Sequence, residues 1–470
     1  MIVASIALLA AYGPSQDYPI FETDFIPAAE HAQRRETLRS KMAPGSVAVF
    51  FANPEQNRNN DVDFQFRQDS NFLYLTGLNE PNAALLLAKD PIEVDGKRVR
   101  EILFVEESNA QIATWVGYRM GSAFAQRHLK LDHAMSNASF AKALEGIRAT
   151  TRYAPLGGRI PTGALARMMP AYRTFAEAGS ERPSDLGRHV GMMRTIKSAD
   201  EIRLLRRAID ASVEGHIAMM KTCTPTMREY ELDAVFEFNI RKRGCEYTGY
   251  PSIIGSGLNS CILHYNTNRR RAEPGDIICI DAGGEYHGYT ADVTRSFPVN
   301  GKFSAEQRAL YDIVLKAQDA GIAECRVGKP FGATNAAAQR VVGEGLVKLG
   351  IIKNASEARR YFMHGTSHYL GLDVHDSHGY SEFQPNMVLT VEPGIYIKAG
   401  SPCDRKWWNI GIRIEDDILV TSGDPVNLSA KAPRRAEDVE RLMAQPGMNM
   451  DQVQSLTAAG LGRHAHHHAH

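Results

Sequence analysis

Apolar runs of strand length alternate with segments of helical spacing through the first part of the chain. The strand-like runs are residues 46–51, 82–90 and 100–107, and the segments with apolar residues every three or four positions are 139–150 and 163–179. Runs of the first kind are typical of buried strands, and the second spacing is typical of amphipathic helices. The alternation predicts an α/β domain, which we place at residues 25–190.

The hydrophobic pattern changes near Ser198. Ser198 is followed three residues later by Glu201, which is the spacing of a capping box at a helix start. Apolar residues then recur at helical spacing as far as residue 220. We expect a long amphipathic helix here that opens a second domain, at residues 191–445.

A second helix start is expected at Thr226. Thr226 and Glu229 repeat the spacing of a capping box, and Gly244 is placed to end the helix that follows. Beyond Gly244 the sequence turns to strand-like runs.

The two ends of the chain differ from the domains between them. The first sixteen residues, MIVASIALLAAYGPSQ, are compatible with a signal peptide or with an apolar N-terminal arm within residues 1–24, so the compartment stays open between cytoplasmic and exported. This run is too short to cross a bilayer, and we expect no stable membrane insertion. Residues 446–470 end in a His-rich tail that we expect to be disordered.

Composition limits the classes of function. Lys plus Arg and Asp plus Glu both total 54 in 470 residues, so no net charge favours nucleic acid or anionic lipid. The six cysteines show no CxxC spacing, and we interpret them as reduced core thiols. Any charge-dependent chemistry must therefore be local.

Four acids interrupt the strand-like runs of the second domain: Asp281, Asp292, Glu392 and Glu415. A buried carboxylate costs several kcal/mol unless a positive group meets it, and four together repel one another. Two divalent cations would supply four balancing charges and would hold a bridging hydroxide between them. Each acid taken singly is also compatible with a salt-bridged strand end, so the prediction of a metal centre rests on the set.

Four histidines strengthen the prediction of a metal centre. They lie within fifteen residues, at His364, His368, His375 and His378. Neutral imidazole is a common metal ligand, and histidine is the usual proton carrier near neutral pH. One of the four can bind metal while others move protons.

These residues stand in longer motifs that resemble one family. The motifs are HYNTN (264–268), DAGGEYHGYTADVTRSFP, FMHGTSHYLGLDVHD, LTVEPGIY and GIRIEDD, and they are similar to those of the aminopeptidase P and prolidase group of metallopeptidases. Residues 57–81 resemble the creatinase-like N-terminal domain of the same group. The resemblance implies an α+β protein in which a creatinase-like α/β domain precedes a catalytic domain of the pita-bread fold.

The resemblance also implies a ligand set for two divalent ions. Its five members are Asp281, Asp292, His368, Glu392 and Glu415. Manganese is the usual metal of the group, and oxygen-rich ligation with one imidazole suits Mn²⁺, although Zn²⁺, Co²⁺ or Fe²⁺ also fit.

Other residues take implied roles around the metals. Glu392 would pass the proton of the attacking water to the leaving nitrogen, and His264 and His375 would stabilise the tetrahedral intermediate. The substrate-binding residues implied by the resemblance are His264, His364, His375, Tyr250 and Arg413. Thr294 and Arg413 would orient the ligands from behind.

The implied activity is that of an Xaa-Pro aminopeptidase, which releases the N-terminal residue from peptides with proline in second position. Proline lacks an amide N–H and restricts the residue before it, so its bond needs a dedicated pocket. Prolidase, which cleaves only Xaa-Pro dipeptides, shares the five ligands and stays open, as does a non-catalytic peptide-binding member of the fold. Creatinase lacks these carboxylates. The resemblance further implies a homodimer or homotetramer.

Overall fold

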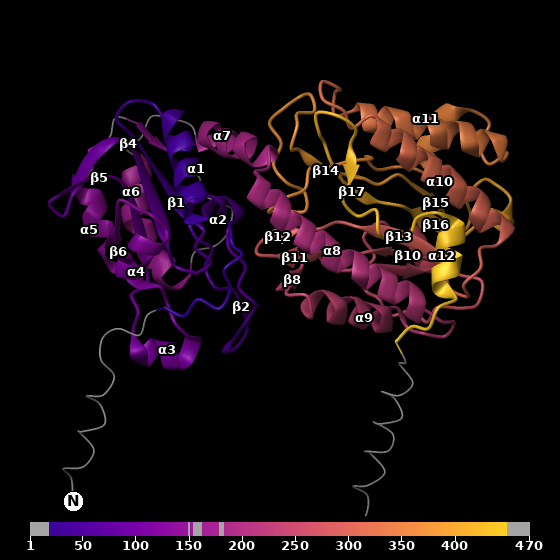
Figure 1. Ribbon diagram of the computed structural model, residues 1–470, viewed down its shortest axis with the longest axis horizontal. Helices are drawn as coiled ribbons and strands as arrows, with labels where there is room; N and C mark the ends of the chain where they lie inside the picture. The colour runs from indigo at the N-terminus through magenta and orange to yellow at the C-terminus, as the bar shows by residue number, and fades with distance from the viewer. Residues whose placement is uncertain (1–17, 149–150, 154–161, 178–182, 449–470) are drawn as a thin grey trace, which may run out of the picture. The chain divides into compact units, whose positions relative to one another are not determined.

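The computed structural model divides the chain into two compact units, Met1–Arg194 and Thr195–His470 (Figure 1). It describes residues 18–148, 151–153, 162–177 and 183–448. The expectations for the apolar N-terminal run and for the His-rich tail therefore fall largely outside the described residues.

Unit 1 is built on a mixed five-stranded sheet with the order β6-β5-β4-β1-β7. The strands of unit 1 are β1 (Ser46–Phe51), β2 (Asn57–Asn59), β3 (Val62–Asp63), β4 (Ala84–Val94), β5 (Lys97–Val105), β6 (His133–Ser136) and β7 (Thr151–Tyr153). The central pairs β1·β4 and β4·β5 are antiparallel, whereas β6 and β7 join the two edges in parallel. The first five residues of β1 are all buried, which explains why this strand is a continuous apolar run rather than an alternating one.

The helices of unit 1 are α1 (Ala28–Ser40), α2 (Ser70–Thr76), α3 (Ala110–Val116), α4 (Gly121–His128), α5 (Phe140–Glu145), α6 (Gly163–Glu177) and α7 (Pro183–Thr195). Side chains of α5 and α6, among them Phe140 and Tyr172, share one buried cluster with alternate residues of the sheet such as Val47 and Val49. The helices expected within 139–150 and 163–179 are thus present as α5 and α6, and they cover one face of the sheet.

A buried histidine in α1 predicts an acid-sensitive unit 1. His31 is 5% exposed, and its Nδ1–H donates to the carbonyl of Tyr74 over 2.9 Å. Burial and the nearby Arg34 lower the pKa of His31 to about 3. As pH falls below about 6.5, the unfolded chain takes up a proton that the folded chain refuses, so the free energy of unfolding should fall by about 1.4 kcal/mol per pH unit toward pH 3. Urea midpoints at pH 7 and pH 5 should show this slope, and a His31→Gln variant should flatten it; an unchanged slope would contradict the assignment.

Unit 2 begins with two helices that differ in how they start. Its helices are α8 (Ala199–Thr222), α9 (Glu229–Arg241), α10 (Ala305–Ala323), α11 (Ala333–Lys348) and α12 (Ala436–Met443), with short 3₁₀ turns at Gly257–Cys261, Ala355–Arg360 and Arg405–Trp407. The predicted capping box is present at α8, where the Ser198 hydroxyl accepts from the Glu201 amide and the Glu201 carboxylate accepts from the Ser198 amide.

The predicted cap of the second helix was wrong. Thr226 has a left-handed backbone with φ 79°, and its amide donates to the carbonyl of Ala272, so it cannot take the extended conformation of an N-cap. The N-cap lies two residues later, at Arg228, whose amide donates to the Glu231 carboxylate over 2.6 Å. The Glu229 side chain instead accepts hydrogen bonds from the amides of Ser256 and Arg270. Gly244, with φ 93°, follows the end of α9 as expected.

The strands of unit 2 form several small sheets. They are β8 (Tyr247–Thr248), β9 (Ile253–Ser256), β10 (Ile277–Asp281), β11 (Gly284–Tyr286), β12 (Tyr289–Thr290), β13 (Thr294–Pro298), β14 (Val388–Val391), β15 (Gly394–Ile397), β16 (Ile410–Arg413), β17 (Asp416–Leu419) and β18 (Val426–Asn427). Their hydrogen-bonded orders are β13-β10-β9, β12-β11-β8, β14-β17-β18 and β15-β16.

Three of the four runs that were expected as single strands are divided in two at the acid, and the fourth ends at its acid. Asp281 is the last residue of β10, Asp292 lies between β12 and β13, Glu392 between β14 and β15, and Glu415 between β16 and β17. The strands before and after these breaks pair with different partners. The breaks therefore place the four carboxylates where the small sheets meet, rather than along the face of a continuous strand.

Among the described residues, no helix combines the length and the apolar character that crossing a membrane requires.

Candidate metal centre

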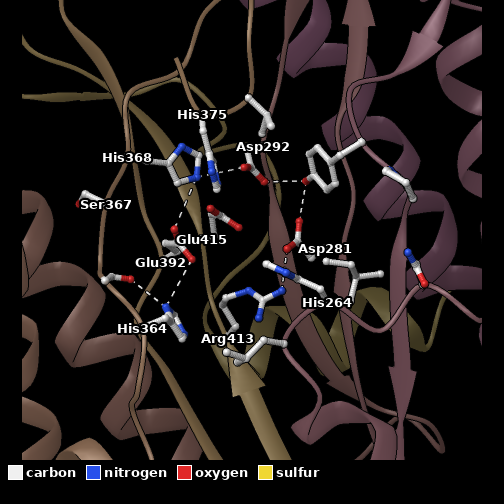
Figure 2. A pocket seen from close by; sticks show the side chains of 17 residues that line it. His264, Asp281, Asp292, His364, Ser367, His368, His375, Glu392, Arg413 and Glu415 are labelled. Atoms are coloured by element: carbon white, nitrogen blue, oxygen red, sulfur yellow. Dashed lines mark hydrogen bonds and ion pairs between the residues drawn. The ribbon is translucent and has the colours of Figure 1, made fainter. Parts of the chain in front are cut away.

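One cavity of about 590 Å³ in unit 2 collects most of the predicted site residues (Figure 2). Its lining includes Tyr250, His264, Asp281, Asp292, His364, His368, His375, Glu392, Arg413 and Glu415. These side chains come from the strands and strand breaks that carry the four acids, and from three connecting segments that hold Tyr250, His264 and residues 364–375. Thr294 lies outside the lining and is fully buried behind it. His378, the fourth histidine of the cluster, does not line the cavity.

Three predicted ligands form a compact group. Ligand atoms of Asp292, His368 and Glu415 all lie within 4.8 Å of one another. Glu392 borders this group, with its Oε1 3.5 Å from His368 Nε2. Asp281 reaches it through Tyr250, whose hydroxyl oxygen lies 2.5 Å from Asp281 Oδ1 and 2.6 Å from Asp292 Oδ1. The geometry thus brings all five predicted ligands to one place.

The ring of His368 is oriented with Nε2 toward the carboxylates. Its Nδ1–H donates to the carbonyl of Tyr369 over 3.2 Å, and its Nε2 lies 3.3 Å from Asp292 Oδ2. Fixing the proton on Nδ1 leaves the lone pair of Nε2 available when the ring is neutral. This is the tautomer that a metal-binding imidazole needs.

The carboxylates repel one another strongly. Burial, followed by the charge of Asp292, raises the pKa of Glu415 well above its ordinary value. Burial also raises the pKa of Glu392, to about 7, and the pKa of Asp292 is raised by burial and by Asp281. Burial opposes a charge on His368, but the hydrogen bond and charge of Asp292 outweigh it and raise its pKa to about 9. A divalent cation would take the place of these protons.

Arg413 holds several residues of the centre together by hydrogen bonds. It is 4% exposed, and its guanidinium donates to Asp281 Oδ2 over 2.6 Å, to the Tyr396 hydroxyl over 2.9 Å and to the Thr294 hydroxyl over 3.1 Å. Thr294 in turn donates to Glu415 Oε2 over 2.5 Å. One arginine therefore connects the strands that carry two of the predicted ligands.

The same network reaches His364. The Tyr396 hydroxyl, which accepts from Arg413, lies 2.8 Å from His364 Nε2. His364 Nδ1–H donates to the carbonyl of Gly365 over 2.8 Å, so Nε2 is the acceptor for the tyrosine proton. Burial and the Arg413 charge lower the pKa of His364 to about 4. His364 is thus held as a neutral, oriented ring at the wall of the cavity.

His264 and His375 lie on the open side of the cavity. Both are exposed, on loops rather than strands. The ring centroid of His375 is 4.2 Å from that of His368, and Figure 2 shows His264 across from it, above Arg413. Side chains in this position can contact a substrate without binding the metals.

Sequence reasoning missed several residues that hold the centre. Tyr396 is the last residue of the LTVEPGIY motif, and no role was predicted for it. Arg295 is fully buried, donates to Asp416 over 2.6 Å and to the carbonyl of Glu415 over 2.6 Å. Arg295 directly follows Thr294, and Asp416 directly follows Glu415. Successive side chains of a strand point to opposite faces, so these two positions could have been expected to lie behind the site.

A buried ion pair supports the loop that carries His375. Lys197 Nζ donates to Asp376 Oδ2 over 2.9 Å, and both side chains are 1% exposed. The two residues are 179 positions apart, so nothing in the sequence pairs them. Asp376 directly follows His375, and the pair therefore fixes the base of this loop.

Breaking the buried pair should destabilise unit 2. A Lys197→Met variant removes the buried ammonium that faces Asp376. Because loss of one member of a buried ion pair is strongly destabilising, we expect the free energy of unfolding to fall by about 3–5 kcal/mol. Urea denaturation measures the change. The matched control is Lys431→Met, whose partner Asp210 is 54% exposed, and its midpoint should equal that of the wild type. A Lys197→Met midpoint equal to that of Lys431→Met would contradict the structural role of the buried pair.

The donor set fits divalent cations. Carboxylate oxygens and one imidazole nitrogen are grouped in one cavity, and the mutual repulsion of the carboxylates calls for positive charge. The outer bonds from Thr294, Arg413 and the Tyr369 carbonyl orient the donors in the way that outer partners orient metal ligands.

Comparison with known proteins agrees with this geometry. Residues 203–422 match the model of metallopeptidase family M24, and residues 31–153 match that of the aminopeptidase P N-terminal domain. The chain is 39% identical over 434 residues to the Xaa-Pro aminopeptidase of Escherichia coli, covering 88% of this chain and 97% of that one. It is 34% identical to human Xaa-Pro aminopeptidase 3, covering 88% and 86%.

A solved structure gives the same result for the fold. Aminopeptidase P from Escherichia coli with the inhibitor Pro-Leu superposes with a TM-score of 0.81 at 37% identity, covering 89% of this chain and 98% of that chain. The predicted fold class, a creatinase-like domain followed by a pita-bread domain, is therefore confirmed. Because the chain is 39% identical to an Xaa-Pro aminopeptidase that it covers to 97%, and residues 203–422 and 31–153 match the two family models, it belongs to metallopeptidase family M24 and carries the N-terminal domain of aminopeptidase P.

Proposed function

We propose that this chain is an Xaa-Pro aminopeptidase that releases the N-terminal residue from peptides with proline in second position. The observation that carries the proposal is the convergence of Asp281, Asp292, His368, Glu392 and Glu415 on one cavity. The relatives named above support the specificity, because both carry the name Xaa-Pro aminopeptidase.

Two divalent ions, with manganese as the first choice, are part of the proposal. When bound, they would lower the pKa of a water molecule and polarise the scissile carbonyl. The ligand set is oxygen-rich with a single imidazole, which suits Mn²⁺.

The chain's own residues then handle protons and charge. Glu392 is partly buried beside His368 and His364, with its Oε2 3.7 Å from His364 Nδ1. It accepts the proton of the attacking water and returns it to the proline nitrogen as the bond breaks. His264 and His375 face the carbonyl oxygen and donate to the negative charge that develops there. His364 and Tyr250 shape the cavity around the proline ring.

Prolidase activity is the second candidate. The GTSHYLGLDVHD motif is more similar to that of aminopeptidase P, which accepts longer peptides, than to that of prolidase. Pro-Leu, the inhibitor in the Escherichia coli aminopeptidase P structure, is the fragment that remains after the first residue leaves Xaa-Pro-Leu. A site that accepts this fragment must have room beyond the proline, which a dipeptidase does not need.

Three peptides separate the possibilities. Protein reconstituted with Mn²⁺ should release the first residue from Xaa-Pro-Leu and should leave Xaa-Ala-Leu intact. Cleavage of Xaa-Pro without cleavage of Xaa-Pro-Leu would make the chain a prolidase, and binding of both without cleavage would make it a non-catalytic member. A Glu392→Gln variant is the control for contaminating peptidases, because it should cleave none of them.

A homo-oligomer, dimer or tetramer, belongs to the same proposal. The end of α3 in unit 1 and the residues just after it expose apolar side chains: Trp115 is 85% exposed, Val116 51% and Tyr118 44%. Exposed apolar groups of this kind often mark protein interfaces. Light scattering should give a multiple of the 51.9 kDa chain mass, and a Trp115→Ser variant should shift it toward the monomer.

A further inference from the structure

The loop that carries His264 is exposed in its middle, yet both of its ends converge on one buried residue. The loop runs from the end of β9 at Ser256 to Arg270, and His264 lies near its middle. Residues 264, 266 and 267 are exposed. An exposed loop holds a side chain in place only if its base is fixed, and the base of this loop surrounds Glu229.

Glu229 is the first residue of α9 and is fully buried. Its Oε1 accepts from the Ser256 amide over 2.8 Å, from the Ser256 hydroxyl over 2.7 Å and from Asn259 Nδ2 over 3.3 Å. Its Oε2 accepts from the Tyr265 hydroxyl over 2.8 Å and from the Arg270 amide over 2.8 Å. One carboxylate thus binds the start of the loop, its end and the residue next to His264.

The contacts require a carboxylate at this position. The partners of both oxygens are donors, and two of them are backbone amides that cannot reverse their role. An amide side chain of the same shape would turn its NH₂ toward one of those amides and leave a donor facing a donor. The start of a helix also favours negative charge. A backbone bond also joins Glu229 to the end of the loop, because the Glu229 amide donates to the Arg270 carbonyl over 3.0 Å.

We propose that Glu229 is a positioning residue for His264: its carboxylate closes the base of the 256–270 loop and thereby places the imidazole at the cavity. Tyr265 is the direct link, since its hydroxyl reaches Glu229 and its backbone adjoins His264. The part of this inference that concerns catalysis rests on the proposed function of His264. The part that concerns the loop does not.

Hydrogen exchange tests the loop directly, without any assay of activity. In Glu229→Gln, amides of residues 257–269 should exchange faster than in the wild type, whereas amides of α10 should not change. Tyr265→Phe removes the bond from its hydroxyl to Glu229 and the long bond of 3.4 Å that the hydroxyl accepts from the Arg269 amide, and it leaves the other bonds of Glu229 intact. It should accelerate the same loop to a smaller extent, and it decides the question if Glu229→Gln does not fold. The matched control is Glu237→Gln, exposed on the same helix. An unchanged loop in the folded variants overturns the proposal.

A double-mutant cycle with His264→Ala tests the catalytic part. With Mn²⁺ and Xaa-Pro-Leu, Glu229→Gln should lower kcat/KM by about 10–100-fold, because a displacement of about 1 Å can cost about 100-fold. In the His264→Ala background the same change should cost less than about twofold, since the misplaced group is already absent. Equal losses in both backgrounds would show that Glu229 acts independently of His264 and would overturn the proposal. If the wild type cleaves no peptide, the proposed function fails, and the exchange experiment alone tests whether Glu229 fixes the base of the loop.

Discussion

Glu415→Gln should abolish activity and at the same time stabilise the metal-free protein. Glu415 is 2% exposed, and its pKa is raised by burial and by Asp292, so its charge opposes folding when no cation balances it. The amide keeps an oxygen that can accept from Thr294 and removes the charge. We expect the free energy of unfolding of the metal-free protein to rise by roughly 0.5–3 kcal/mol, the usual size of a single-residue effect.

The gain should reverse once Mn²⁺ is added. The wild type should gain stability from the ion, because ligands that bind only the folded state stabilise it. The variant lacks an anionic ligand and should show little or no shift, with activity reduced more than about 100-fold. Thermal unfolding with EDTA and with Mn²⁺ measures both effects. Glu344→Gln, at a 65% exposed position on α11, is the control and should behave as wild type. A variant that is less stable without metal, yet still shifted by Mn²⁺, would refute the account.

Arg413→Met should damage both stability and activity. The change leaves Asp281 without its cationic partner, and loss of one member of a buried pair costs about 3–5 kcal/mol. Loss of the bonds to Thr294 and Tyr396 should also misorient the ligands, which typically lowers activity or metal affinity by about 10–100-fold. Urea denaturation and kcat/KM on Xaa-Pro-Leu measure the two effects.

Arg413→Lys separates charge from geometry. Lysine keeps a positive charge near Asp281 but lacks the planar fork that reaches three partners, so it should recover most of the stability and little of the activity. Arg340→Met, at a 63% exposed position, is the control for removal of an arginine. Full activity in Arg413→Lys would show that charge alone suffices and would contradict the role of the fork.

The sequence predicts the site better than it predicts the strands that build it. Charged residues within apolar runs are conspicuous, so Asp281 and Glu392 could be identified as a group with the other acids. The division of three of these runs at the acid was not predictable, because the pattern of buried residues is the same for one strand as for two strands that join different sheets. The break is decided by tertiary pairing, which apolar periodicity does not record.

Residues that support the site depend on distant partners and were mostly missed. The spacing of Thr226 and Glu229 suggested a local capping box, but Glu229 instead binds a loop up to 41 residues away. Local patterns cannot distinguish a cap from a buried carboxylate with remote donors. Tyr396 likewise gains its role only from Arg413 and His364, which the fold brings to it.

A metal titration of peptide cleavage tests the central claim most directly. Metal-stripped protein is titrated with Mn²⁺ while release of the first residue from Xaa-Pro-Leu and the number of bound ions are recorded together. We predict no cleavage without metal, binding of two ions per chain, and activity that rises with their occupancy. Cleavage that persists in the stripped protein, or binding of two ions without cleavage of any Xaa-Pro peptide, would contradict the account.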